Sequence, residues 1–260
     1  MTADTTSAVR KLAHTLGVAP DELHGLSALP ADDVRLLRAQ ISEALFQADR
    51  PRFARMAALS NAVPVALAAK VTQFALPPLL AARAAELVDP SRAAELVRRL
   101  SDDYLADVSA ALDAVRAAEV VARIPADRVA TVAAELARRE EWVVIGGFVA
   151  QVSPDALAAS IATFDGAQLL HIAFVLDEKS RLDEIGELLT DAQLDDLLAA
   201  AGRERLWIEL DDMLTHLSDS PVARMRVRLA AAPAAVRKAV RAALNDGLLR
   251  AAAVLFEGGA

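Results

Sequence analysis

Four consecutive blocks of twelve residues fill the chain from Asp89 to Leu136: DPSRAAELVRRL, SDDYLADVSAAL, DAVRAAEVVARI and PADRVATVAAEL. The same period extends back over residues 77–88 and resumes at 153–201, where a single residue, Asp177, is skipped. Apolar residues recur mainly at block positions 5, 8, 9 and 12. Because this is the i, i+3, i+4, i+7 spacing of one helical stripe, each block predicts a short amphipathic α-helix.

The first position of most blocks carries a residue that suits the N-terminus of a helix. Asp, Ser and Thr side chains accept hydrogen bonds from the free amides of the first turn, and these residue types stand at Asp89, Ser101, Asp113, Ser153, Asp165 and Thr190. A helix of about nine residues is only ~14 Å long and is unstable alone in water. The blocks must therefore stack, and the sequence predicts an all-α fold: a superhelical solenoid of short antiparallel helices with helical caps.

The stretch EWVVIGGFVAQV, residues 141–152, has two interpretations. Its VVIGG segment is similar to the strand-to-turn entry of a dinucleotide-binding fold, but the G-x-G-x-x-G pattern fails because Phe148 and Gln151 replace the later glycines. If ARRE at 137–140 extends the preceding helix by about one turn, the stretch becomes another block with an apolar stripe. We interpret it as a helix, in which close helix approach explains Gly146.

The ends of the chain do not keep the period, which predicts three parts in one continuous body. Residues 1–62 are expected to form an N-terminal helical cap, with a break between two helices at the Asp-Arg-Pro sequence of 49–51. Residues 63–213 form the array of short helices, and residues 214–260 are basic C-terminal helices that close the stack. Within the array, 63–88 holds only three charged residues. We therefore expect a central, buried helix there, broken at its two adjacent prolines.

Composition excludes several classes of function. The chain has no cysteine, which excludes disulfides, thiolate metal sites and cysteine nucleophiles. The four histidines form no metalloprotease motif, no phosphate-binding loop or nucleophile motif is present, and no metal or other cofactor is expected. A net charge of −8 and few aromatic residues argue against nucleic-acid binding. The excess of arginine over lysine suggests a GC-rich bacterial genome.

Membrane insertion and secretion are not expected. The longest run without a charged residue is 14 residues long, from Met56 to Ala69, and is interrupted by Pro64, whereas a spanning helix needs about 20 residues. The start of the chain lacks the apolar region of a secretory signal, so the cytoplasm is the expected location.

The C-terminal region is basic although the chain as a whole is acidic. From Val222 onward there are seven basic and two acidic residues, a net charge of +5. We expect these basic residues to pack against the chain's own acidic surface; the alternatives are an acidic partner or a peripheral membrane contact through the basic C-terminal helix. Upstream, Asp212 and His216 are spaced i, i+4 and could hold a metal with a third ligand, but we interpret them as a surface pair.

Two apolar segments suggest a ligand site. The helices expected at 63–76 and 141–152 lack interior charges except Lys70, so a curled stack could enclose an acyl chain or another apolar ligand between them. The candidate ligand-binding residues are Val65, Phe74, Gly146, Gly147, Phe148, His171 and Phe174. His171 would supply a donor that orients the ligand. The alternative is that these residues are ordinary core packing.

The cadence of the blocks, clearest in VDPSRAAELVRRL and LTDAQLDDLL, resembles the cytoplasmic N-terminal domain of MgtE-type magnesium channels and related helical repeats of a flagellar-motor switch protein. The resemblance covers about residues 77–201. In the channel family this domain is an acidic superhelix that regulates a pore through bound magnesium. The resemblance therefore implies a superhelical fold, and it raises the question whether acidic pairs such as Asp102 and Asp103 bind magnesium. Within these 260 residues we find neither a pore segment nor a nucleotide-sensing strand pattern, so regulation of a pore in the same chain is not expected.

Two functional hypotheses result. The first is a non-catalytic helical-repeat module that binds another protein or forms a homo-oligomer. The second is a soluble carrier or sensor of a hydrophobic small molecule, such as an acyl chain or lipid, held between the two apolar helices. An enzymatic function ranks third.

Overall fold

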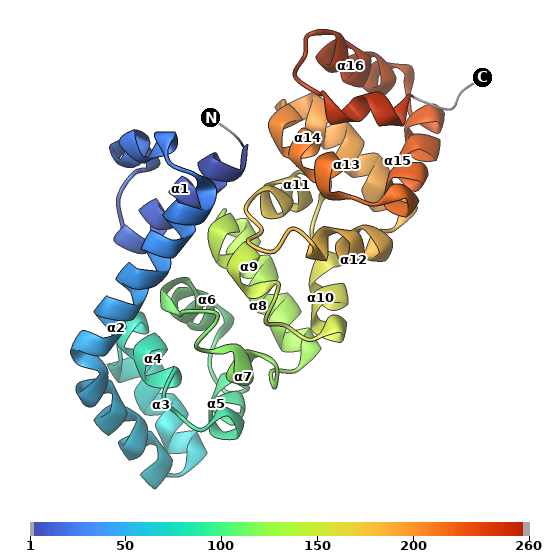
Figure 1. Cartoon of the computed structure of the whole chain (residues 1–260). Coiled ribbons are helices and arrows are strands. Elements are labelled where there is room, and N and C mark those ends of the chain that lie inside the picture. The colour runs from blue at the N-terminus through green and yellow to red at the C-terminus, as the bar shows by residue number, and fades with distance from the viewer. Residues whose placement is uncertain (1–2, 257–260) are drawn as a thin grey trace. The chain divides into compact units, whose positions relative to one another are not determined.

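The computed structural model describes residues 3–256, apart from the side chains of residues 3, 49, 59–61 and 252. Within this range every regular element is a helix, so the predicted all-α stack is confirmed (Figure 1). The elements are α1 (Ala3–Leu16), η1 (Pro20–Ala28), α2 (Ala31–Ala62), α3 (Val65–Ala75), α4 (Pro78–Ala85), α5 (Pro90–Val97), α6 (Asp102–Ala111), α7 (Ala118–Val121), α8 (Ala126–Arg138), α9 (Trp142–Phe148), α10 (Pro154–Ile161), α11 (Gly166–Phe174), α12 (Arg181–Leu188), α13 (Asp191–Glu204), α14 (Trp207–His216), α15 (Asp219–Ala231), α16 (Ala234–Asn245) and η2 (Ala251–Leu255).

The helices group into two compact units, Met1–Ser160 and Ile161–Ala260. The sequence predicted boundaries after residues 62 and 213, whereas the two compact units meet between residues 160 and 161. The three predicted parts stay a prediction. Each unit is described by itself below.

The first unit begins with α1, η1 and α2, which pack around a small core. Ala8, Val9 and Leu12 of α1 are buried against Val34 of α2. The break expected in α2 was wrong, because α2 is one helix of 32 residues that contains Pro51 in its interior. A helix can carry an interior proline at the loss of one main-chain hydrogen bond. Here α2 packs against α1 and α4, which favours the continuous helix.

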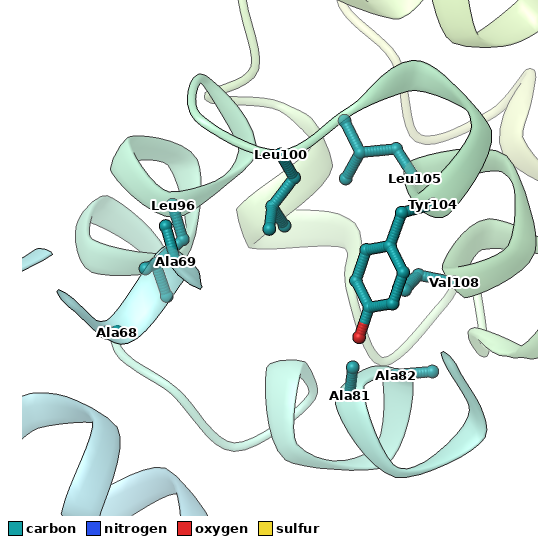
Figure 2. Packing of buried hydrophobic residues seen from close by; sticks show 9 residues of the cluster. All are labelled: Ala68, Ala69, Ala81, Ala82, Leu96, Leu100, Tyr104, Leu105 and Val108. Carbon is teal, nitrogen blue, oxygen red and sulfur yellow. The ribbon is translucent and has the colours of Figure 1, made fainter. Parts of the chain in front are cut away.

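The rest of the first unit is a stack in which alternate helices pack on one another. α3 packs on α5, α4 on α6, α5 on α7 and α6 on α8 (Figure 1). A helix therefore meets its main neighbour two blocks, or 24 residues, along the chain. One shared cluster of buried residues joins α3, α4, α5 and α6 (Figure 2), and its members are Ala68, Ala69, Ala81, Ala82, Leu96, Leu100, Tyr104, Leu105 and Val108.

The helix starts follow the sequence prediction closely. Five of the capping residues predicted at block position 1 accept a hydrogen bond from the main-chain amide three residues later, at the start of a helix: Asp89, Ser101, Ser153, Asp165 and Thr190. Asp113 accepts hydrogen bonds from the amides of Val115 and Arg116 in a turn, and α7 begins only at Ala118. The predicted break between α3 and α4 is also confirmed, since α3 ends at Ala75 and α4 begins at Pro78.

The glycine-containing stretch 141–152 is helical, as interpreted from its apolar stripe. α8 ends at Arg138, the chain turns at Glu140 with a φ of 60°, and α9 runs from Trp142 to Phe148. α9 packs on α8 and α1. Its two glycines are placed differently, because Gly146 is buried whereas a Cβ on Gly147 would meet nothing within 4 Å.

The second unit is built around α11 and α13, which form its most extensive helix contact. α14 packs on α11, and α15 and α16 pack on α13. The core of this unit is dominated by leucine and methionine, and its fully buried side chains include Leu170, Leu194, Leu197, Leu198, Leu210, Met213, Met225 and Leu229.

Candidate functional site

The apolar helix α3 is buried on one side only. Ala68 and Ala69 are 4% exposed and face α5, the main packing partner of α3. On the opposite side Leu67 is 51% exposed, Val71 49% and Phe74 82%. The prediction of a central helix buried on all sides was therefore wrong, because the side of α3 that carries Leu67, Val71 and Phe74 meets solvent.

The exposed side chains of α3 form a continuous strip. Leu67, Val71 and Phe74 are spaced i, i+4 and i+7, so they lie on one side of the helix. The exposed Lys70 lies in the same strip and is the only charged residue of α3. We call these four residues the α3 face.

Hydrogen bonds hold both ends of α3. Arg92 donates to the main-chain oxygen of Val63, which lies just before the helix. The Tyr104 hydroxyl donates to the main-chain oxygen of Leu76, just after the helix, over 2.9 Å. Figure 2 shows the Tyr104 side chain extending from α6 towards Ala81 of α4. The α3 face is thus presented on a helix that is fixed at both ends by later blocks.

These end contacts belong to a polar ladder that follows the repeat. Arg92, Tyr104, Arg116 and Arg128 all stand at block position 4, twelve residues apart. Arg92, Tyr104 and Arg128 donate to main-chain oxygens at or just beyond the C-terminal ends of α2, α3 and α5, where carbonyl groups lack helical partners. Arg116 instead pairs with Glu86, the residue that follows α4. The sequence signal for this ladder is a long side chain with a hydrogen-bond donor at position 4 of each of these blocks.

Glu86 is a buried carboxylate with incomplete pairing. Its side chain is 0% exposed. Its Oε1 accepts hydrogen bonds from Arg83 Nη1 at 2.9 Å and from the Asp113 amide at 3.1 Å. Its Oε2 accepts no hydrogen bond from the described residues, and Arg116 Nε lies 3.7 Å away. Burial raises the pKa of Glu86, outweighing the Asp113 amide and the two arginines, which lower it.

A pH dependence follows from this raised pKa. Because the folded state holds the proton of Glu86 more tightly than the unfolded chain, its contribution to stability is complete below the ordinary pKa of 4.5 and is lost as pH rises through the folded pKa. We expect Glu86→Gln to flatten the decline of the free energy of unfolding as the pH rises above about 4.5. Urea titrations at several pH values measure this slope.

The control for Glu86 is a carboxylate that shares its arginine. Glu43 is 52% exposed and pairs with Arg116 at 2.7 Å. An exposed ion pair contributes little to stability, so Glu43→Gln should leave the pH slope close to that of the wild type. A slope equally altered by both variants, or by neither, would contradict the assignment to Glu86.

The predicted ligand-binding residues lie on three helices: Val65 and Phe74 on α3, Gly146, Gly147 and Phe148 on α9, and His171 and Phe174 on α11. Val65 packs against the cluster of Figure 2, whereas Phe74 points into solvent. α3 packs mainly on α5, and α9 packs on α8 and α1. In the second unit, Phe174 is 2% exposed and belongs to the core. The ligand site between the two apolar helices stays a prediction.

A buried ion pair lies in the second unit. Lys179 and Asp212 have side chains 12% and 5% exposed, and Lys179 Nζ lies 2.6 Å from Asp212 Oδ2. Lys179 also donates to the main-chain oxygens of Ala173 and Phe174 at 2.8 and 2.9 Å, which caps the C-terminal end of α11. His216 Nδ1 lies 2.8 Å from the main-chain oxygen of Asp212. The interpretation of Asp212 and His216 as a surface pair was wrong, because Asp212 is buried by its contact with Lys179.

Four acidic pairs in the sequence are candidates for magnesium, namely Asp102 and Asp103, Asp183 and Glu184, Asp195 and Asp196, and Asp211 and Asp212, and all take part in contacts within the chain. Their partners are Arg128 for Asp102, Arg139 for Asp103, the Ser218 amide for Asp183, Arg181 for Glu184, Arg228 for Asp195, the Gly166 amide for Asp196, the Ala251 amide for Asp211 and Lys179 for Asp212. In the part of the chain that the structure describes, no three His, Asp or Glu residues are grouped so that they could hold a metal ion.

Two of the seven basic residues, Arg224 and Arg228 of α15, contact acidic residues of the same unit, so the expected packing is confirmed for this part of the basic region. Arg228 pairs with Asp195, and the hydrogen bond from Arg228 lowers the pKa of that carboxyl group. Arg224 donates to the main-chain oxygen of Leu189 at 2.6 Å and lies 3.3 Å from Asp191. These contacts join α15 to α12 and α13.

None of the helices within residues 3–256 is both long and apolar enough to cross a membrane.

Comparison with known families supports the resemblance drawn from the repeat. The family described as the MgtE intracellular N domain matches residues 52–144, so this part of the chain resembles that domain. The match begins within α2, includes the α3 face and the polar ladder, and ends near the start of α9. It begins earlier and ends earlier than the range 77–201 in which the resemblance was recognised. Neither the curated proteins nor the solved structures give a match.

Proposed function

We propose that this chain is a non-catalytic helical-repeat module of the cytoplasm that binds another protein through the α3 face. The observation that carries the proposal is the position of Leu67, Val71 and Phe74 on the solvent side of a helix whose other side is buried. Single exposed apolar residues are normal, but a contiguous apolar strip is typical of an interaction site. The cytoplasmic location is supported by the resemblance to an intracellular domain.

The shape of the α3 face favours a protein over a small ligand. Small-molecule sites are concave and bury most of the ligand. The side of a single helix is convex, and apolar residues at i, i+4 and i+7 suit packing against another helix. The alternative, a carrier or sensor of a hydrophobic small molecule, remains the second hypothesis and predicts co-purified lipid in native mass spectrometry.

Phe74→Asp tests the proposal. Because Phe74 is 82% exposed, we expect this change to alter the free energy of unfolding by less than about 0.5 kcal/mol. Binding should fall by at least about tenfold, since a central aromatic residue usually dominates an interface. Ile208→Asp is the matched control, because Ile208 is 60% exposed on α14 of the second unit.

The partner is identified first and measured second. A photo-crosslinking amino acid at position 74, and separately at position 208, identifies proteins that contact each site in living cells. A protein crosslinked only from position 74 is then purified, and calorimetry compares its affinity for the wild type and the two variants. Equal affinity for all three chains, or crosslinking to lipid alone, would contradict the proposal.

A further inference from the structure

We infer that the partner of the α3 face is an amphipathic helix with a carboxylate at the middle of its apolar stripe; this inference rests on the proposed function. Lys70 lies between Leu67 and Phe74 in the exposed strip and is the only charge on α3. No described residue forms an ion pair or hydrogen bond with its ammonium group. A partner that covers the strip must therefore leave the ammonium in water or supply an anion.

A second copy of the chain fits the α3 face poorly. The strip runs from residue 67 to residue 74, so its midpoint lies beside Lys70. In a two-fold symmetric pair the same patch is used by both copies, and antiparallel packing through this midpoint would bring the two Lys70 ammonium groups close together. Like charges oppose such an interface. The position of Lys70 thus favours a partner that is not a second copy of this chain and that carries a negative charge opposite Lys70.

The structure also favours a helix over other forms of partner. An extended peptide binds most often by adding a strand to a sheet edge, and the described residues contain no strand. A membrane surface is bound by helices with several basic residues on the polar face, whereas α3 has one. The strip extends from residue 67 to residue 74, which is about 10 Å along the helix axis. This length matches that of the contact between two packed helices.

Two designed peptides test the charge at the centre. Both are labelled helical peptides of about fourteen residues with leucine at i, i+4 and i+7, and they differ only in a Glu or a Lys at i+3, the middle of that stripe. Fluorescence anisotropy measures their affinity for the full chain. We expect the Glu peptide to bind about fivefold more tightly than the Lys peptide at low salt. Lys70→Glu should reverse this preference, and about 0.5 M salt should weaken it.

The variants separate the two proposals. A preference that Lys70→Glu leaves unchanged would overturn the inference about the carboxylate, while loss of binding in Phe74→Asp would still support the α3 face. Binding that Phe74→Asp and Ile208→Asp reduce equally would overturn both. The inference also fails if neither peptide binds at about 1 mM, or if anionic vesicles bind the chain in a Lys70-dependent manner and the peptides do not.

Discussion

Gly166→Ala will lower the free energy of unfolding of the second unit by about 3 kcal/mol or more. Gly166 is the first residue of α11 and lies against the backbone of α13, where a Cβ atom would come within 2.5 Å of Asp196 C and Leu197 Cα. These are backbone atoms, so no side-chain rotation can remove the clash. The Gly166 amide also donates to Asp196 Oδ2 at 2.7 Å, and this bond would be lost if the helices separated.

The control for Gly166 is a second helical glycine with the opposite expectation. A Cβ on Gly147 would meet nothing within 4 Å, so Gly147→Ala should raise stability by up to about 1 kcal/mol through helix propensity alone. The two tryptophans allow separate measurement, since Trp142 lies in the first unit and Trp207 in the second. Fluorescence during urea unfolding should show a lower midpoint for Trp207 in Gly166→Ala. An unchanged Trp207 transition would show that the two helices can separate without cost.

The repeat predicted the helices well because its information is local. Block length, the apolar stripe and the capping side chains act within one helix, and the capping residues such as Asp89 and Thr190 do what their positions predicted. Contacts between helices were harder to predict. The close crossing at Gly166 depends on residues 30 positions later, and position 2 of a block gives no sign of it. Pro51 likewise predicts the end of a helix from the sequence. The packing of α2 against α1 and α4, which the sequence does not show, favours the continuous helix.

The candidate site shows the same limit. The apolar composition of α3 was correctly recognised as unusual, but burial on all sides requires a neighbour on each side, and composition does not supply the neighbours. Phe74 was placed in an interior site although it is among the most exposed apolar residues. The Lys179 and Asp212 pair was missed because its members are 33 residues apart and neither belongs to a recognisable motif.

Asp212→Ala will destabilise the second unit by about 3–5 kcal/mol, because it leaves the ammonium group of Lys179 nearly buried without its anionic partner. Lys179→Met should cost a similar amount, since Asp212 would then be the unpaired charge. The double variant Lys179→Met with Asp212→Leu should recover most of the loss, as buried ion pairs can be replaced by packed apolar residues. Unfolding followed at Trp207 measures all three.

The exposed pair of Arg203 and Glu204 is the control for the assignment of Lys179 and Asp212 as a buried, stabilising ion pair. Its side chains are 57% and 42% exposed and lie 3.4 Å apart, so Glu204→Ala should change stability by less than about 1 kcal/mol. If Asp212→Ala costs no more than Glu204→Ala, water must reach Lys179 and the pair is not buried in solution. If the double variant is no more stable than Lys179→Met, the loss in both comes from the uncapped carbonyl groups at the end of α11, to which Lys179 also donates.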